Sequence, residues 1–154
     1  MPSIRLQIVN AIQTSLQAAG GPGGLTVYRE LNRPVEADAL PAIVIKVRRE
    51  PKPEPLAHSG YRAPLVERQM TVILELRAEG NLSTPTDVAL DAVYVWACQR
   101  MFADVSFGGL ANEVVEEEKE WESQEGNIPI ASCAAQFLVK YRTSRLDPSS
   151  ANTV

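Results

Sequence analysis

The chain has 154 residues, a formal net charge of -4, 45% hydrophobic and 22% charged residues, which is typical of a globular domain and argues against wholesale disorder. No apolar stretch approaches the ~20 residues of a membrane helix, and Met1–Arg5 lacks the basic and apolar regions of a secretory signal. Two cysteines, Cys98 and Cys133, form neither a disulfide framework nor a zinc cluster, so we expect folding in a reducing cytoplasm.

A single histidine, His58, narrows the enzymatic alternatives. Any Ser-His-Asp or Cys-His arrangement would have to use this residue, which lies among prolines. The zinc-protease HExxH, the phosphate-binding GxxxxGK[ST] and the dinucleotide-binding GxGxxG motifs are all absent. We therefore predict a protein that is not an enzyme, with no catalytic, cofactor-binding or metal-binding residues.

The chain opens with a pattern that predicts an amphipathic helix from about Ser3, its N-cap, to Ala19. Apolar residues recur every four positions, and Gly20-Gly21 ends the pattern. The stripe consists of Ile4, Ile8, Ile12 and Leu16.

Three β-strands are expected next, at Leu25–Leu31, Ala42–Arg49 and Glu67–Glu79. The second and third alternate apolar and polar side chains, as half-buried strands do. Between them, Glu50–Val66 contains four prolines and a glycine, which oppose regular hydrogen-bonded structure. This segment is longer than most connections and predicts an arm that projects from a β-hairpin.

A second helix follows, with Thr84 as N-cap, Pro85 in the first helical position and Asp87 as the acid of a capping box. Its expected apolar face is broad. It comprises Ala89, Leu90, Ala92, Val93, Trp96, Ala97 and Met101.

The last third predicts a β-hairpin, with Asn112–Ser123 pairing with Ile130–Arg145 across a turn at residues 125–127. We expect residues 1–146 to form one domain and 147–154 a flexible tail. The fold class is α+β, in the order α-β-β-β-α-β-β, with a mostly antiparallel sheet and both helices on one face. Expected core residues are Ile8, Ile12, Val72, Leu74, Val93, Trp96 and Phe137.

An acidic run is the most unusual feature. Seven of the 19 acidic residues lie within 13 positions, with Lys119 as the single basic residue among them. One interpretation is a solvated edge strand whose charge discourages aggregation. Another is an electrostatic surface, which either binds a basic partner or lines a channel and repels DNA. The seven are Glu113, Glu116, Glu117, Glu118, Glu120, Glu122 and Glu125.

The proline-rich arm has a basic and aromatic character. It is either a solvent-exposed loop or an arm that orders on a neighbouring subunit, for which a basic arm and an acidic strand on one chain would be complementary. The candidate interface residues are Arg48, Arg49, Lys52, His58, Tyr61, Arg62, Glu113, Glu116, Glu118 and Glu120.

The element order over residues 3–145 resembles that of the tail terminator proteins of long-tailed bacteriophages, the lambda U-like minor tail proteins. The segments that are similar in their order and residue character include SIRLQIVNAIQTSLQ, AIVIKVRRE, RQMTVILELRAEG, TPTDVALDAVYVWACQRMF and IASCAAQFLVKYRTSR. That family has no invariant motif, so the resemblance transfers no individual residue.

The resemblance implies a structural virion protein that forms a hexameric ring on the tail tube, ends tail polymerisation and presents a surface for head joining. Its expected partners are further copies of itself, the tail tube protein and the head-tail connector. DNA would pass through the channel without specific binding. Another head-tail joining or tail-completion protein is a neighbouring alternative, and a small enzyme or small-molecule-binding domain that uses the Glu-rich strand is the alternative from a different class.

Overall fold

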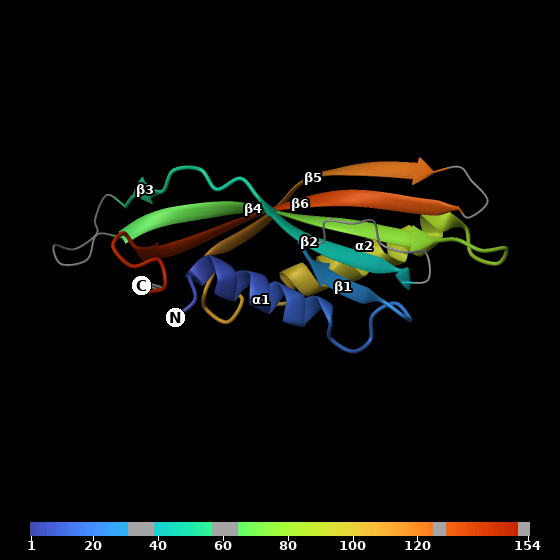
Figure 1. The fold of residues 1–154 in the computed structure, drawn as a ribbon, viewed down its shortest axis with the longest axis horizontal. Coiled ribbons are helices and arrows are strands. Elements are labelled where there is room, and N and C mark those ends of the chain that lie inside the picture. The colour runs from blue at the N-terminus through green and yellow to red at the C-terminus, as the bar shows by residue number, and fades with distance from the viewer. Residues whose placement is uncertain (31–38, 57–64, 125–128, 151–154) are drawn as a thin grey trace.

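The computed structural model describes residues 1–30, 39–56, 65–124 and 129–150. They form one twisted sheet with two helices packed along a single face (Figure 1). In chain order the elements are α1 (Ile4–Leu16), β1 (Thr26–Arg29), β2 (Ala42–Arg48), β3 (Glu54–Pro55), β4 (Leu65–Glu79), α2 (Thr86–Phe102), β5 (Glu113–Gln124) and β6 (Ile130–Ser144). The mixed α+β class is therefore confirmed.

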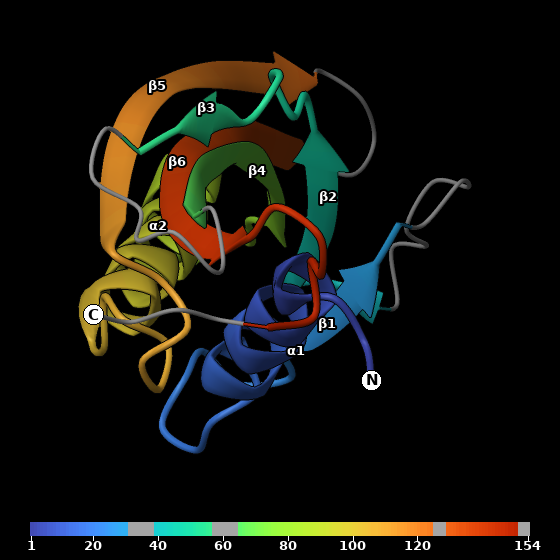
Figure 2. The same cartoon turned by 90° about the vertical axis from the view of Figure 1, so that its left-hand side faces the viewer.

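The strand order in the sheet is β1-β2-β4-β6-β5, with the short β3 paired to β4. β4 and β6 form the centre through fifteen antiparallel residue pairs, from Leu65 opposite Ser144 to Glu79 opposite Ile130. β1 and β5 are the two edges of this order, and Figure 2 shows how strongly the sheet curls between them.

Two features of the sheet were not specified by the sequence prediction. β1 pairs with β2 in parallel, whereas the other strand pairs described are antiparallel, which agrees with the predicted mostly antiparallel sheet. The segment Glu50–Val66 is not devoid of strand, since Glu54 and Pro55 pair with Glu67 and Val66. Proline is tolerated there because β3 leaves one side of its backbone unpaired.

The first helix begins as expected, with Ser3 Oγ accepting a hydrogen bond from the Leu6 amide (3.3 Å). It ends at Leu16 rather than Ala19, because the chain turns at Gln17 and then enters the left-handed region at Gly20 (φ 99°). Glycine adopts that conformation at little cost.

The predicted cap of the second helix is wrong. Pro85 occupies the N-cap position and no side chain caps the helix, whereas Thr84 belongs to the preceding turn. Asn81 organises that turn, since its Oδ1 accepts hydrogen bonds from the amides of Ser83 and Thr84. Asp87 accepts from the Val88 amide and stays in the first turn, where its charge favours the helix dipole.

The core lies between the helices and the inner face of the sheet. Buried side chains of α1 and α2 meet alternate residues of β2, β4 and β6, and include Ile8, Ile12, Val72, Leu74, Val93 and Phe137. Trp96 is an exception to the predicted core, because it is only partly buried on the flank of α2 that faces α1. Its Nε1 donates to the backbone oxygen of Leu16 (3.1 Å).

Residues 147–150, which the sequence assigns to a flexible tail, make backbone hydrogen bonds. The Ile4 amide donates to the Pro148 oxygen (2.9 Å) and the Ser144 amide to the Ser150 oxygen (3.2 Å). Residues 151–154 lie outside the described part of the chain. Within the described ranges, no helix has the length and hydropathy required to cross a membrane.

Candidate functional site

The acidic strand β5 lies at one edge of the sheet, as the sequence predicts, and contains a β-bulge. Glu116 pairs with Phe137, but the next paired residue, Lys119, lies opposite Ala135, so three steps on β5 match two on β6. The extra residue reverses the alternation of side chains after the bulge. Lys119 and Trp121 therefore take the helix side of β5, and Glu120 and Glu122 take the outer face.

On the helix side, the bulge brings together a polar cluster of Tyr94, Glu116 and Lys119. The Tyr94 hydroxyl donates to Glu116 Oε1 (2.5 Å), and Lys119 Nζ donates to both the Tyr94 oxygen (2.7 Å) and Glu116 Oε1 (2.9 Å). Glu116 was predicted as part of a solvated or interfacial surface. Its carboxylate is instead bound within the subunit, where it connects β5 to α2.

The electrostatics of this cluster follow from those contacts. The hydrogen bonds from Tyr94 and then Lys119 lower the pKa of Glu116 below its ordinary value. Partial burial and the hydrogen bond to the Glu116 carboxylate raise the pKa of Tyr94 to about 12. Lys119 has a raised pKa through its bonds to Tyr94 and Glu116. At neutral pH the cluster is a neutral phenol between a carboxylate and an ammonium group.

Trp121 lies next to this cluster at the seam between β5 and α2. Its ring packs edge-to-face on Tyr94, with 5.4 Å between the ring centroids. Even so, 47% of the residue remains exposed, because β5 is an edge strand with no neighbour on its far side. The sequence analysis did not single out Trp121, because it treated Asn112–Ser123 mainly as an acidic run.

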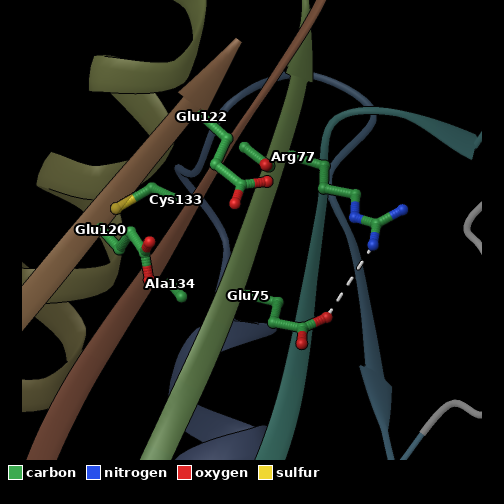
Figure 3. Close-up of a pocket in the computed structure, with 7 residues that line it drawn as sticks. Glu75, Arg77, Glu120, Glu122, Cys133 and Ala134 are labelled. Carbon is green, nitrogen blue, oxygen red and sulfur yellow. Dashed lines mark ion pairs between the residues drawn. The ribbon is translucent and has the colours of Figure 1, made fainter. Parts of the chain in front are cut away.

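The outer face of the sheet carries the remaining glutamates of β5. Glu113 forms an ion pair with Lys140 (3.0 Å), and Glu118 accepts from Gln136 Nε2 (3.4 Å). Glu120 and Glu122 line a shallow hollow of about 190 Å³ together with Glu75 and Arg77 of β4 (Figure 3). In that hollow Arg77 reaches Glu75 (3.9 Å), which is also held by Lys46 of β2 (2.7 Å).

The hollow would be the natural place for the small-molecule alternative, yet its chemistry does not assemble a reactive site. Glu75 is neutralised by two basic neighbours, and the hollow is partly open to solvent. Among the residues that the structure describes, no group of three His, Cys, Asp or Glu side chains is arranged to hold a metal ion.

The basic candidates cluster at the opposite side of the sheet. Arg48 ends β2 and forms an ion pair with Glu30 (3.2 Å), while Arg49 and Lys52 follow it and are exposed. Arg49 adopts a left-handed backbone (φ 55°), and its carbonyl accepts from the Thr71 amide (3.2 Å), which fixes the chain there. His58, Tyr61 and Arg62 lie outside the described residues, as does Glu125.

Both cysteines are poor nucleophiles in this setting. Burial raises the pKa of the Cys133 thiol to about 11, and partial burial also raises that of Cys98, which lies 4.0 Å from Glu116 Oε2. A reactive thiol needs a lowered pKa and a cationic environment. Lys119 lowers the pKa of both thiols, but burial outweighs it, so neither thiol is activated in this setting.

No known protein family matches the sequence, and no curated protein matches it either.

Proposed function

We propose that this protein is the subunit of a ring, of about six copies, that caps the tail tube of a long-tailed bacteriophage at the head-proximal end. In that role it stops tail polymerisation, contacts the tail tube protein and the head-tail connector, and lets DNA pass without binding it specifically. The resemblance of the chain to tail terminators supplies the biological setting. The observation that supports ring formation is the distribution of charge across the sheet.

The two sides of the sheet carry opposite charge. β5 holds six glutamates and one lysine. At the other side, β1 pairs only with Ala42–Ile45 of β2, so the rest of β2 forms this edge of the sheet. Residues 26–30 and 42–52 there hold five basic and two acidic residues. The pairing register shows that the two segments overlap along the sheet, since Ala42 shares a row with Glu122, and Arg48 shares one with Val115.

This polarity favours a contact between unlike edges of two copies. Unlike edges attract, whereas a two-fold contact between two β5 edges would oppose glutamates to glutamates. A head-to-tail contact between unlike surfaces closes into a ring when its rotation divides the circle. Arg49, Lys52, Glu118 and Glu120 are exposed and so are available for such a contact.

Charge reversal tests the proposal. Glu118→Lys with Glu120→Lys reverses the charge at two exposed positions of the acidic edge, and Arg49→Glu with Lys52→Glu does the same at two exposed positions of the basic side. Each variant alone should fail to form rings, because like charges then face each other. A mixture of the two variants should recover rings, in which the variants alternate around an even number of positions. Native mass and negative-stain images, with and without tail tubes, report the outcome.

A matched control reverses the same kinds of charge on interior strands. Glu79→Lys lies at the end of β4 and Arg145→Glu follows β6, so neither is on an edge. Both controls should assemble like the wild type. Assembly that is unaffected by either edge variant, or that the mixture fails to recover, contradicts the edge contact. If neither the edge variants nor a change of salt concentration from 0.1 to 1 M affects assembly, the result supports a β5 that lines the channel instead.

The biological role has its own test. Deleting the gene should give free tails of abnormal length when the protein terminates the tail. Tails of normal length that fail to join heads would identify a head-tail joining protein, and a monomer with no effect on either structure would reject the ring.

A further inference from the structure

Trp121 is the largest side chain that the acidic edge exposes. It is 47% exposed although it belongs to a paired strand, and it is held in place by its edge-to-face contact with Tyr94. Tyr94 is itself fixed by hydrogen bonds to Glu116 and Lys119. The indole is thus a rigid apolar group on the surface. Tryptophans of this kind are strongly enriched among the residues that dominate protein interfaces.

The immediate surroundings of Trp121 are acidic. Its sequence neighbours Glu120 and Glu122 point to the outer face, and Glu117 lies in the bulge. All three are exposed, and none of the ion pairs among the described residues involves them. The carboxylates of Glu120 and Glu122 lie on the opposite face of β5 from the indole, so they make the edge attractive to cations as a whole, while the ring quadrupole of Trp121 adds an attraction at the ring itself.

The chain already uses this combination inside the subunit. Lys119 Nζ lies 4.6 Å from the centre of the Tyr94 ring and is paired with Glu116. The guanidinium of Arg100 lies 5.5 Å from the centre of the Trp96 ring. Trp121 is more exposed than either of these two rings, and no cation of its own subunit is found over its ring among the described residues.

We infer that Trp121 anchors the contact between copies by receiving a basic side chain from the Arg48–Lys52 segment of the next copy, with Arg49 as the side chain over the indole. Because Trp121 lies in the row of Ile43, six residues along β2 from Arg49, the next copy is displaced along the strand direction in this contact. Arg49 is exposed, forms no ion pair among the described residues, and has its backbone fixed by the hydrogen bond to Thr71. Arginine is preferred over lysine for stacking on a tryptophan ring. This inference rests on the proposed ring and names the residues that would hold it together.

The experiment compares Trp121→Ala, Trp121→Phe and the wild type by sedimentation at several protein concentrations. Loss of an interface anchor should weaken association about 30-fold or more. Phenylalanine should recover part of this, because its ring keeps a weaker attraction for cations. Val88→Ala is the matched control, because Val88 is 54% exposed on α2 and lies away from β5. Far-ultraviolet circular dichroism confirms that each variant is folded.

A spectroscopic readout makes the test independent of assembly strength. The protein has two tryptophans, Trp96 and Trp121. Incorporation of 5-fluorotryptophan gives two ¹⁹F resonances, and Trp121→Phe assigns them without altering Trp96. The Trp121 resonance should shift on assembly while that of Trp96 stays. Arg49→Gln should abolish the shift and weaken assembly, whereas Arg145→Glu should do neither.

The outcomes separate the inference from the ring itself. If rings form and the charge-reversed variants complement each other, but Trp121→Ala assembles normally and the Trp121 resonance does not move, then the anchor is wrong and the ring stands. If the wild type remains monomeric at every concentration and with tail tubes, the ring is wrong and the anchor with it. If the Trp121 resonance shifts but the protein forms no assembly larger than a dimer, the anchor is supported and the ring is contradicted.

Discussion

Lys119 and Tyr94 are joined twice, because the ammonium group lies over the phenol ring and also donates a 2.7 Å hydrogen bond to its oxygen. One residue comes from the edge strand β5 and the other from α2. The pair therefore fastens the edge of the sheet to the helix beneath it, beside the half-exposed Trp121.

Tyr94→Phe should destabilise the subunit by about 1 kcal/mol, a figure in the range of a single net hydrogen bond. The loss stays small because Glu116 and Lys119 remain paired with each other at 2.9 Å. Urea unfolding measures the change in free energy. Phe102→Tyr, which adds a hydroxyl to an exposed helix residue, is a control for the aromatic exchange. An unchanged stability for Tyr94→Phe would mean that the Tyr94 hydroxyl contributes nothing to the stability of the subunit.

The same cluster sets a pH dependence. Glu116 has a lowered pKa in the folded state, so its contribution is present above its ordinary value of 4.5 and is lost as the pH falls through the lowered value. Tyr94 has a pKa raised to about 12, so its contribution to stability is complete below pH 10 and is lost as the pH rises towards 12.

The wild type and Glu116→Gln test the acidic limb. The difference between their free energies of unfolding should shrink as the pH is lowered. Parallel curves would contradict this assignment.

The contact of Trp96 with the turn after α1 gives a third prediction. Replacing a completely buried aromatic residue by alanine lowers the free energy of unfolding by ~3–5 kcal/mol. Because Trp96 is only partly buried, we expect Trp96→Ala to lower it by about 2–3 kcal/mol. A Cβ at Gly21 would lie 2.9 Å from Cε2 of the indole, so Gly21→Ala should cost about 1–3 kcal/mol. Trp96→Phe should remove part of the Gly21→Ala penalty in a double-mutant cycle. Additive losses would show that the two residues do not touch.

Two deletions test the bulge. Removal of Glu117 leaves two steps between Glu116 and Lys119, so every later side chain of β5 keeps its face and the fold should survive. Removal of Glu120 instead moves Trp121 to the outer face and Glu122 to the helix side. That variant should lose stability and the near-ultraviolet circular dichroism of the Trp121–Tyr94 pair. Equal stabilities of the two deletions would argue against the observed register.

The helices and the long strands were predictable because their burial follows simple periods. Ile4, Ile8, Ile12 and Leu16 are buried at helical spacing, and Met70, Val72, Leu74 and Leu76 are buried at strand spacing. Local capping was less predictable. Thr84 and Asp87 fit a capping box by residue type, but Asn81 takes the hydrogen bonds of the turn and shifts the start of the helix.

The bulge was the decisive feature that periodicity could not supply. A regular strand through Glu116 would place Glu118, Glu120 and Glu122 against the helices, where their desolvation would be costly. The sequence does not resolve the register, since Trp121 lies seven positions after Val114 and six after Val115, and both valines are apolar. Only the pairing with β6 shows where the extra residue lies. The parallel pairing of β1 with β2 likewise depends on the path of the chain rather than on either strand.

The central pairing of β4 with β6 has a consequence for how the chain reaches this structure. Leu65 pairs with Ser144, so the ladder cannot be completed until nearly the whole described chain is available. During synthesis β4 would have β2 on one side and an open edge on the other, and such edges recruit other chains. The large sequence separation of these pairs also predicts slow folding, on the millisecond-to-second scale. α2 lies between β4 and β6 in sequence and packs on both, so it can shelter β4 while the last strand is made.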